Sequence, residues 1–165
     1  MDRIVDTNVL VVANDSALLR HPSECVTACC DAIEEIEDRG RVVLDSRWEI
    51  LGEYEANVRS EGQPGVGDAF LKWILTNLSN PRRCLQVPIT PLSAPPWYGE
   101  FPERPDLAGF DRNDRKFVAV ALSYGGRAPI LNAVDTDWWI FRSPLEELGV
   151  KIEFLCQDEM KRPGR

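Results

Sequence analysis

The sequence is poor in histidine and has no long apolar run: it contains one histidine, His21, among 165 residues. A membrane-spanning helix needs about 20 consecutive apolar residues, and no stretch approaches that length. The N-terminal residues are charged and lack the pattern of a signal peptide. We therefore expect a cytoplasmic protein without a membrane segment. Because no Gly-x-Ser-x-Gly motif accompanies His21, a serine hydrolase is not indicated.

Motifs that bind phosphate or zinc are also missing. The glycine-rich segment 62–67 is not followed by the Lys-Ser or Lys-Thr of a phosphate-binding loop. The five cysteines form no Cys-x-x-Cys pair, and we expect all of them to be reduced core residues. The net charge of −8, from 19 basic and 27 acidic residues, disfavours binding driven mainly by nonspecific attraction to phosphate. It leaves room for an enzyme that holds nucleic acid through metal ions.

The apolar fraction of 44% predicts one compact α/β domain, which we place at residues 1–160. Residues 161–165 are expected to form a basic tail. Apolar runs predict strands at 3–6, 41–45, 129–134 and 151–156, with an extended piece at 84–90, and helical spacing predicts helices at 23–39, after Ser46, at 67–78, at 111–124 and from Ser143. The proline-rich segment 91–106 is expected to be a surface loop and a candidate lid. Alternating strands and helices favour a three-layer α/β/α sandwich with a central, mostly parallel sheet.

Four acidic residues fall where such a sheet places its ligands. Asp6 and Asp135 each follow a predicted strand directly, and the carboxyl ends of strands form the binding edge of open α/β sheets. Asp114 lies in the first turns of an apolar helix, and Glu53 lies on the helix that leaves the second strand. Carboxylates gathered at one edge would repel each other unless a cation neutralised them. Such oxygen ligands suit Mg²⁺ or Mn²⁺, and metal ions held in this way support phosphodiester hydrolysis.

The four acidic residues and their neighbours resemble, in their order along the chain, the motifs of PIN-domain nucleases. The segment 4–10, Ile-Val-Asp-Thr-Asn-Val-Leu, is similar to the family's first motif, and Glu53-Tyr54 is similar to the second acidic motif of toxin-type members. The segments 114–122 and 135–137 resemble the third and fourth motifs. The resemblance implies a Mg²⁺- or Mn²⁺-dependent endoribonuclease that acts on single-stranded RNA, often the toxin of a toxin–antitoxin pair. It also implies an antitoxin protein as a partner and a homodimer.

The resemblance further suggests roles for single residues. Catalysis is expected from Asp6, Glu53, Asp114 and Asp135, and metal binding from Asp6, Asp114, Asp135 and Asp137. Asn8 is expected to orient Asp6 or a bound water, with Thr7 as a second supporting residue. Arg112, Arg115 and Lys116 flank the third motif and are candidates for contact with RNA phosphates. Trp138 and Trp139 are expected to be buried anchors.

Three alternatives stay open. Glu49 lies one helical turn before Glu53 and competes with it as the acid of the second motif. Many relatives carry Thr or Ser two residues before the fourth-motif Asp, where this chain has Ala133, so Asn132 or Thr136 would have to substitute. A catalytically weakened PIN-fold protein that binds RNA or protein is the alternative function. A phosphatase with Asp6 as nucleophile is disfavoured, because no second Asp follows two positions on.

Overall fold

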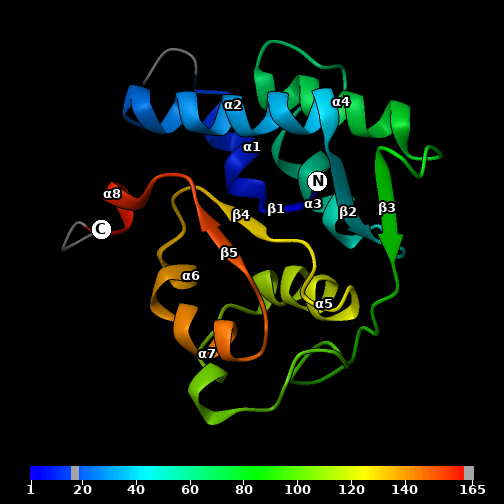
Figure 1. Cartoon of the computed structure of the whole chain (residues 1–165), viewed down its shortest axis with the longest axis vertical. Coiled ribbons are helices and arrows are strands. Elements are labelled where there is room, and N and C mark those ends of the chain that lie inside the picture. Colours follow the sequence, from blue (N-terminus) through cyan, green and yellow to red (C-terminus); the bar gives the residue numbers. More distant parts are fainter. Residues whose placement is uncertain (16–18, 162–165) are drawn as a thin grey trace.

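Five parallel strands form one sheet in the order β3-β2-β1-β4-β5 (Figure 1). The computed structural model describes residues 1–15 and 19–161. The strands are β1 (Asp2–Val5), β2 (Arg41–Asp45), β3 (Cys84–Val87), β4 (Ile130–Asn132) and β5 (Ile152–Phe154). In the centre, β1 places Asp2 opposite Arg41 of β2 and Ile4 opposite Ile130 of β4. All strands finish at the same end of the sheet, which we call the carboxyl edge.

Helices cover both faces of this sheet (Figure 1). One face carries α1 (Thr7–Ala13), α2 (Ser23–Arg39) and α4 (Val66–Asn77), and the other carries α5 (Arg115–Ser123), α6 (Thr136–Ile140) and α7 (Arg142–Glu147). The remaining pieces are α3 (Glu49–Asn57), which contacts both α1 and α5, α8 (Gln157–Met160), and the short 3-10 helices η1 (Pro105–Leu107) and η2 (Arg112–Asp114). The fold is a three-layer α/β/α sandwich, which confirms the predicted class.

Helix α2 shows how the sequence pattern produces the packing. Its apolar positions recur at helical spacing, and the side chains buried there are Cys25, Val26, Cys29, Ile33 and Ile36. The helix ends at Gly40, whose N–H donates to the Ile36 carbonyl at 3.0 Å. A Cβ at Gly40 would lie 2.8 Å from the Ile36 Cα, so only glycine allows β2 to start at the next residue. The predicted ranges 23–39 and 41–45 are both confirmed.

Helices α1 and α6 are not predicted by the periodicity, because seven and five residues are too few to display it. Each begins at a carboxylate that follows a strand: Asp6 caps α1 and Asp135 caps α6. The helix expected directly after Ser46 begins at Glu49, so Ser46 is not its N-terminal cap. The carboxylate of Asp45, fully buried at the end of β2, instead accepts the N–H groups of Arg47, Glu49 and Ile50 at 2.9 to 3.0 Å.

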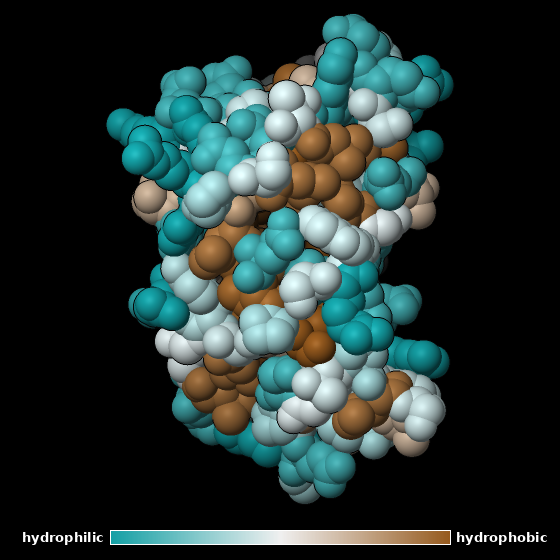
Figure 2. Space-filling view, turned by 90° about the vertical axis from the view of Figure 1, so that its right-hand side faces the viewer, coloured by the Kyte–Doolittle hydropathy of each residue, from teal (hydrophilic) through white to brown (hydrophobic). Residues whose placement is uncertain are grey.

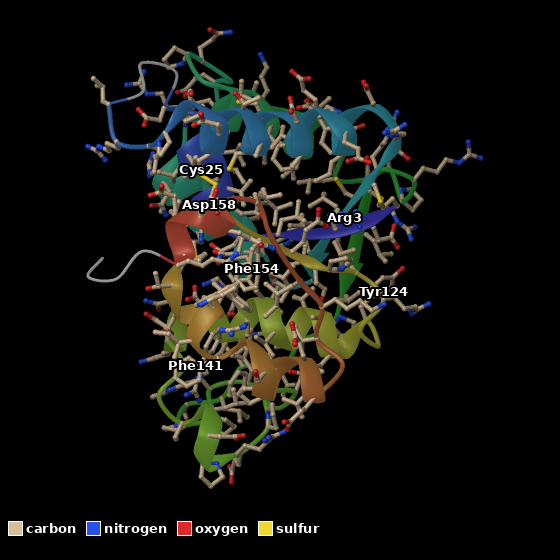
Figure 3. All side chains as sticks on the ribbon, turned by 60° about the vertical axis from the view of Figure 1, so that its left-hand side comes forward. Arg3, Cys25, Tyr124, Phe141, Phe154 and Asp158 are labelled. Carbon is tan, nitrogen blue, oxygen red and sulfur yellow. A yellow bond between two sulfur atoms is a disulfide. The ribbon has the colours of Figure 1, made fainter. Side chains whose placement is uncertain are left out.

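One pair corrects the prediction that all five cysteines are reduced. Cys25 of α2 and Cys156, which follows β5, form a disulfide across 131 positions. Figure 3 shows Cys25 beside the segment that carries Asp158. This pairing depends on the docking of the C-terminal segment against α2, which no local spacing encodes. Cys29 and Cys84 are free and buried, as predicted, and Cys30 is free and half-buried.

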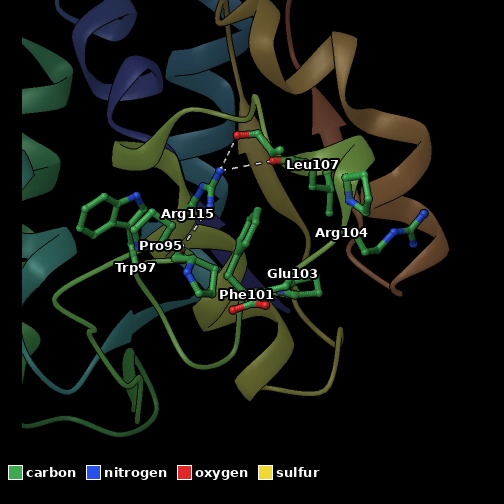
Figure 4. Close-up of a pocket in the computed structure, with 11 residues that line it drawn as sticks. Pro95, Trp97, Phe101, Glu103, Arg104, Leu107 and Arg115 are labelled. Atoms are coloured by element: carbon green, nitrogen blue, oxygen red, sulfur yellow. Dashed lines mark hydrogen bonds between the residues drawn. The ribbon is translucent and has the colours of Figure 1, made fainter.

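The proline-rich segment 91–106 is a loop, as predicted, except that η1 begins at Pro105. Arg115, at the start of α5, holds this loop from the inside (Figure 4). Its guanidinium donates to the carbonyls of Pro96, Leu107, Ala108 and Phe110 at 3.0 to 3.3 Å. Arg115 is buried and donates to these four carbonyls, so it supports the loop. These bonds give its predicted contact with RNA no support.

The outer surface adds two observations. No helix in the described ranges is long and apolar enough to cross a bilayer. On the side of the molecule that carries β3, hydrophobic side chains are broken up by hydrophilic ones (Figure 2). Of the predicted tail 161–165, only Lys161 belongs to the described residues.

Asp45→Ala is expected to lower the free energy of unfolding by about 2 kcal/mol, because the first turn of α3 loses a buried acceptor for its N–H groups. Asp45→Asn keeps one acceptor oxygen and should lose less. Urea unfolding monitored by circular dichroism measures both, with the exposed Glu34→Ala on α2 as control. Equal stability of Asp45→Ala and the control would contradict this capping role.

Candidate metal centre

Three carboxylates meet at the carboxyl edge of the sheet. Asp6, Asp114 and Asp135 each offer one oxygen, and these oxygens lie within 4.8 Å of one another. Asp6 follows β1 and Asp135 follows the neighbouring β4, and the Asp6 N–H donates to the Leu131 carbonyl at 3.0 Å. Asp114 arrives from the opposite helix layer, at the junction of η2 and α5. The predicted convergence of these three acids is thus present in the fold.

Asp6 is fixed through both of its carboxylate oxygens. One accepts the Asn8 N–H at 3.1 Å, and the other accepts the indole N–H of Trp138 at 2.6 Å. Trp138 is fully buried, as predicted, and packs edge-on against Phe110 with ring centroids 5.0 Å apart. The indole was not foreseen as a partner of Asp6, and a tryptophan three residues after a strand-end Asp is the only sequence signal that pointed to it.

The Asn8 side chain has a different role from the predicted one. Its amide donates to the Asn132 side-chain oxygen at 2.7 Å, and its oxygen accepts the Ala133 N–H at 2.7 Å. Asn132 in turn donates to the Asp135 carbonyl at 3.1 Å. Asn8 therefore orients the turn that carries Asp135, while only its backbone contacts Asp6. Asn132 supports this turn in place of the hydroxyl that Ala133 lacks.

Burial and mutual repulsion oppose ionisation of this cluster. Removal from water raises the pKa of Asp6 well above its usual range, and the nearby charges of Asp135 and Glu53 add to that shift. Burial likewise raises the pKa of Asp114, helped by the charges of Asp6 and Asp135. A divalent cation would relieve both effects, since it lets the carboxylates ionise without repelling. The all-oxygen donor set fits Mg²⁺ or Mn²⁺.

Glu53 lies beside the cluster but outside the three-oxygen group. Its carboxylate accepts the Thr7 hydroxyl at 2.5 Å and forms an ion pair with Lys116, which is 7% exposed and also donates to the Asn113 carbonyl. The competing acid Glu49 instead accepts the Tyr98 hydroxyl at 2.6 Å. The geometry thus favours Glu53 as the fourth acid, and it assigns Thr7 and Lys116 to hold that acid.

Two further predicted residues lie around the cluster. Asp137 accepts the Asp111 N–H at 2.8 Å, and its oxygens are not part of the three-oxygen group, so its predicted metal binding is not seen in this geometry. Repulsion from Asp135 contributes to a raised pKa of Asp137, after the larger effect of burial. Arg112 is exposed, and its guanidinium carbon lies 3.6 Å from the centre of the Trp97 ring. Of the three predicted basic contacts, Arg112 is the one that faces solvent.

Asp114→Asn is expected to stabilise the metal-free protein by roughly 1 to 3 kcal/mol at neutral pH, since it removes a carboxyl that must take up a proton to be buried on folding. In the unfolded chain the carboxyls ionise near pH 4, whereas the folded pKa values are raised. The folded state therefore binds more protons, and metal-free stability should fall as pH rises from about 4 through neutrality. The stability of Asp114→Asn should fall less steeply with rising pH than that of the wild type.

Urea unfolding in EDTA and in Mn²⁺ checks both statements. The free energy of unfolding of the wild type should rise by about 2.7 kcal/mol at a Mn²⁺ concentration 100 times the dissociation constant. Asp114→Asn should lose this response to Mn²⁺. The exposed Asp31→Asn on α2 is the control. An Asp114→Asn protein that is less stable than wild type in EDTA would refute the repulsion argument.

Lys116→Met is expected to cost roughly 1 to 3 kcal/mol of stability, because Glu53 is left without its cation in a partly buried position. Adding Glu53→Gln should restore at least about 1 kcal/mol. A double-mutant cycle of urea unfolding measures the coupling. Additive effects would show that the two side chains do not depend on each other.

No family model, curated protein or solved structure matches the chain. What the site can do is therefore judged from its motifs and its own geometry.

Proposed function

We propose that this protein is a metal-dependent endoribonuclease of the PIN-domain type, which hydrolyses phosphodiester bonds of single-stranded RNA. The observation that carries the proposal is the meeting of Asp6, Asp114 and Asp135 within 4.8 Å at the carboxyl edge. These acids belong to three of the four motifs on which the resemblance rests, and the fourth acid, Glu53, lies next to them. The three-layer α/β/α fold agrees with that family.

The chain's residues divide the work as follows. Asp6, Asp114 and Asp135 would hold Mg²⁺ or Mn²⁺, which when bound activates water and offsets negative charge on the phosphate. The Trp138 indole and the Asn8 backbone keep Asp6 oriented, and the Asp137 N–H does the same for Asp135 at 2.9 Å. Because these donors are already in place, binding the metal requires little reorganisation of its ligands.

The proposal extends to partners. A toxin of this kind would be neutralised by an antitoxin segment that covers the carboxyl edge. With a net charge of −8 on this chain, a basic or hydrophobic antitoxin segment fits best. We also propose a homodimer, by the same resemblance.

A second candidate is an RNA- or protein-binding scaffold of the same fold with a weakened site. It is favoured by one observation: among residues 1–15 and 19–161 the close group contains three acids, and Glu53 is bonded to Thr7 and Lys116 instead. Tight Mn²⁺ binding without RNA cleavage would support it.

The test is cleavage of a mixed-sequence single-stranded RNA by purified protein in Mg²⁺ or Mn²⁺. We expect cleavage that EDTA abolishes and that an Asp6→Asn/Asp114→Asn double variant reduces by at least about 100-fold, the order of loss seen when a catalytic metal site is removed. Asp31→Asn should keep full activity. A wild-type protein that binds Mn²⁺ and leaves the RNA intact would overturn the nuclease proposal in favour of the scaffold.

A further inference from the structure

We propose that Trp48 and Trp97, together with Arg112, form a platform beside the metal centre on which unpaired bases of single-stranded RNA stack. This inference rests on the proposed function, which it deepens by naming how the substrate is recognised. None of its three residues belongs to the four acidic motifs, and Arg112 lies two residues before the third.

The backbone conformation of the two tryptophans is the first observation. Trp48 has φ 64° and Trp97 has φ 76°, and they are the only non-glycine residues with positive φ in the described ranges. A bulky side chain in the left-handed region is unfavourable. Such strain persists where the surroundings impose it, and it clusters at binding sites. That both outliers are tryptophans points to a use for the rings.

Exposure is the second observation. Trp48 is 41% exposed, more than any of the other four tryptophans. Trp138, by contrast, is fully buried. Trp97 is half-buried and lines a cavity of about 540 Å³ together with the proline-rich loop. An exposed indole offers a flat, apolar face, which stacks on any base.

The segments that carry the two tryptophans are joined by a hydrogen bond between their neighbouring residues. Trp48 directly precedes the first residue of α3 and lies three residues after the end of β2. The hydroxyl of Tyr98, next to Trp97, donates to Glu49, next to Trp48, at 2.6 Å. This bond ties the loop to the start of the helix, so the two tryptophans belong to segments that contact each other.

Arg112 joins the platform to the metal centre. Its guanidinium carbon lies 3.6 Å from the centre of the Trp97 ring, and it is two residues before Asp114. An exposed guanidinium held on an aromatic ring can stack on a base or contact a phosphate. Arg47, next to Trp48, is also exposed. In a chain of net charge −8, two arginines flanking the tryptophans provide a local match for the RNA backbone.

Arg115 holds the loop that presents Trp97 from the interior of the protein (Figure 4). Arg115 donates to the Pro96 carbonyl at 3.3 Å, directly before Trp97 in the chain. Its guanidinium also stacks on Phe101, with the guanidinium carbon 4.4 Å from the centre of the ring. A platform that is already in place orders few groups when it binds. It would accept single strands and reject duplexes, whose base faces are covered by their neighbours.

The test compares two fluorescein-labelled single-stranded RNA oligonucleotides, one normal and one with abasic sites, by anisotropy in EDTA so that neither is cleaved. Loss of stacking on one base lowers the affinity roughly 5- to 150-fold. We therefore expect wild type to bind the normal oligonucleotide at least about 10-fold more tightly than the abasic one. Trp48→Gly and Trp97→Gly should each reduce that ratio toward unity.

Glycine is chosen because it accepts the left-handed backbone, so the ring is removed without leaving a strained side chain. If Trp48 serves the fold, Trp48→Gly lowers the melting temperature; if it serves binding, the melting temperature stays level or rises while the ratio falls. Trp48→Phe should retain most of the ratio. The matched control is Trp73→Ala on α4, which removes a ring whose centre lies 5.7 Å from that of Phe70. This variant should keep the wild-type binding ratio.

The outcomes separate the platform from the nuclease. A wild-type ratio near unity, no binding of either oligonucleotide, or folded Trp48→Gly and Trp97→Gly proteins with the wild-type ratio would each overturn the platform, even where metal-dependent cleavage is found. A high ratio that both variants lose supports the platform, even where no RNA is cleaved.

Discussion

Electrostatic repulsion among three carboxylates, the buried Asp6 and Asp114 and the half-buried Asp135, is the constraint on which the carboxyl edge depends. Asp6, Asp114 and Asp135 are brought within 4.8 Å by the parallel pairing of β1 with β4 and by the approach of α5. Burial makes each charge costly, and the neighbours add to that cost, which is why the pKa values of Asp6 and Asp114 are raised. A fold keeps such a cluster at a price in stability, and a divalent cation is the simplest means of offsetting it.

The surrounding donors act on the same constraint from the protein side. The Trp138 indole and the N–H groups of Asn8 and Asp137 each donate to a carboxylate, so they stabilise its charged form and fix its direction. Lys116 pairs with Glu53, which keeps a fourth negative charge beside the cluster without an uncompensated burial. The two capped helices, α1 and α6, begin at these acids, so the same side chains that could bind metal also start the helices.

The loop at 91–106 illustrates how a buried arginine can decide the shape of a surface. Arg115 donates to the Pro96 carbonyl within the loop and to the carbonyls of Leu107, Ala108 and Phe110 just after it, so one side chain joins both stretches of backbone. Trp97 is thereby held next to Arg112 and near α3, and its neighbour Tyr98 is bonded to Glu49. The proposed recognition of RNA bases thus depends on an interior contact that has no direct access to a substrate.

Local sequence determined much of this protein. Helical spacing in 23–39 and the apolar run at 41–45 predict α2 and β2 to the residue, and alternation of such elements predicts the parallel sheet. Strand-end acids predict the meeting of Asp6 with Asp135, because neighbouring parallel strands end together. These features follow from periods of a few residues and from the rules of parallel connection, so the sequence carries them without knowledge of the whole fold.

Only the tertiary structure decided which side chains meet across the chain. Four contacts join residues from different elements: the Cys25–Cys156 disulfide, the bonds from Arg115 to the loop carbonyls, the bond from Trp138 to Asp6 and the bond from Thr7 to Glu53. Helices α1 and α6 are too short for periodicity and exist because a strand-end carboxylate caps them. The physical reason is common to these cases: a side chain's partner depends on how packed elements are positioned in three dimensions, and residue type and spacing limit that choice without making it.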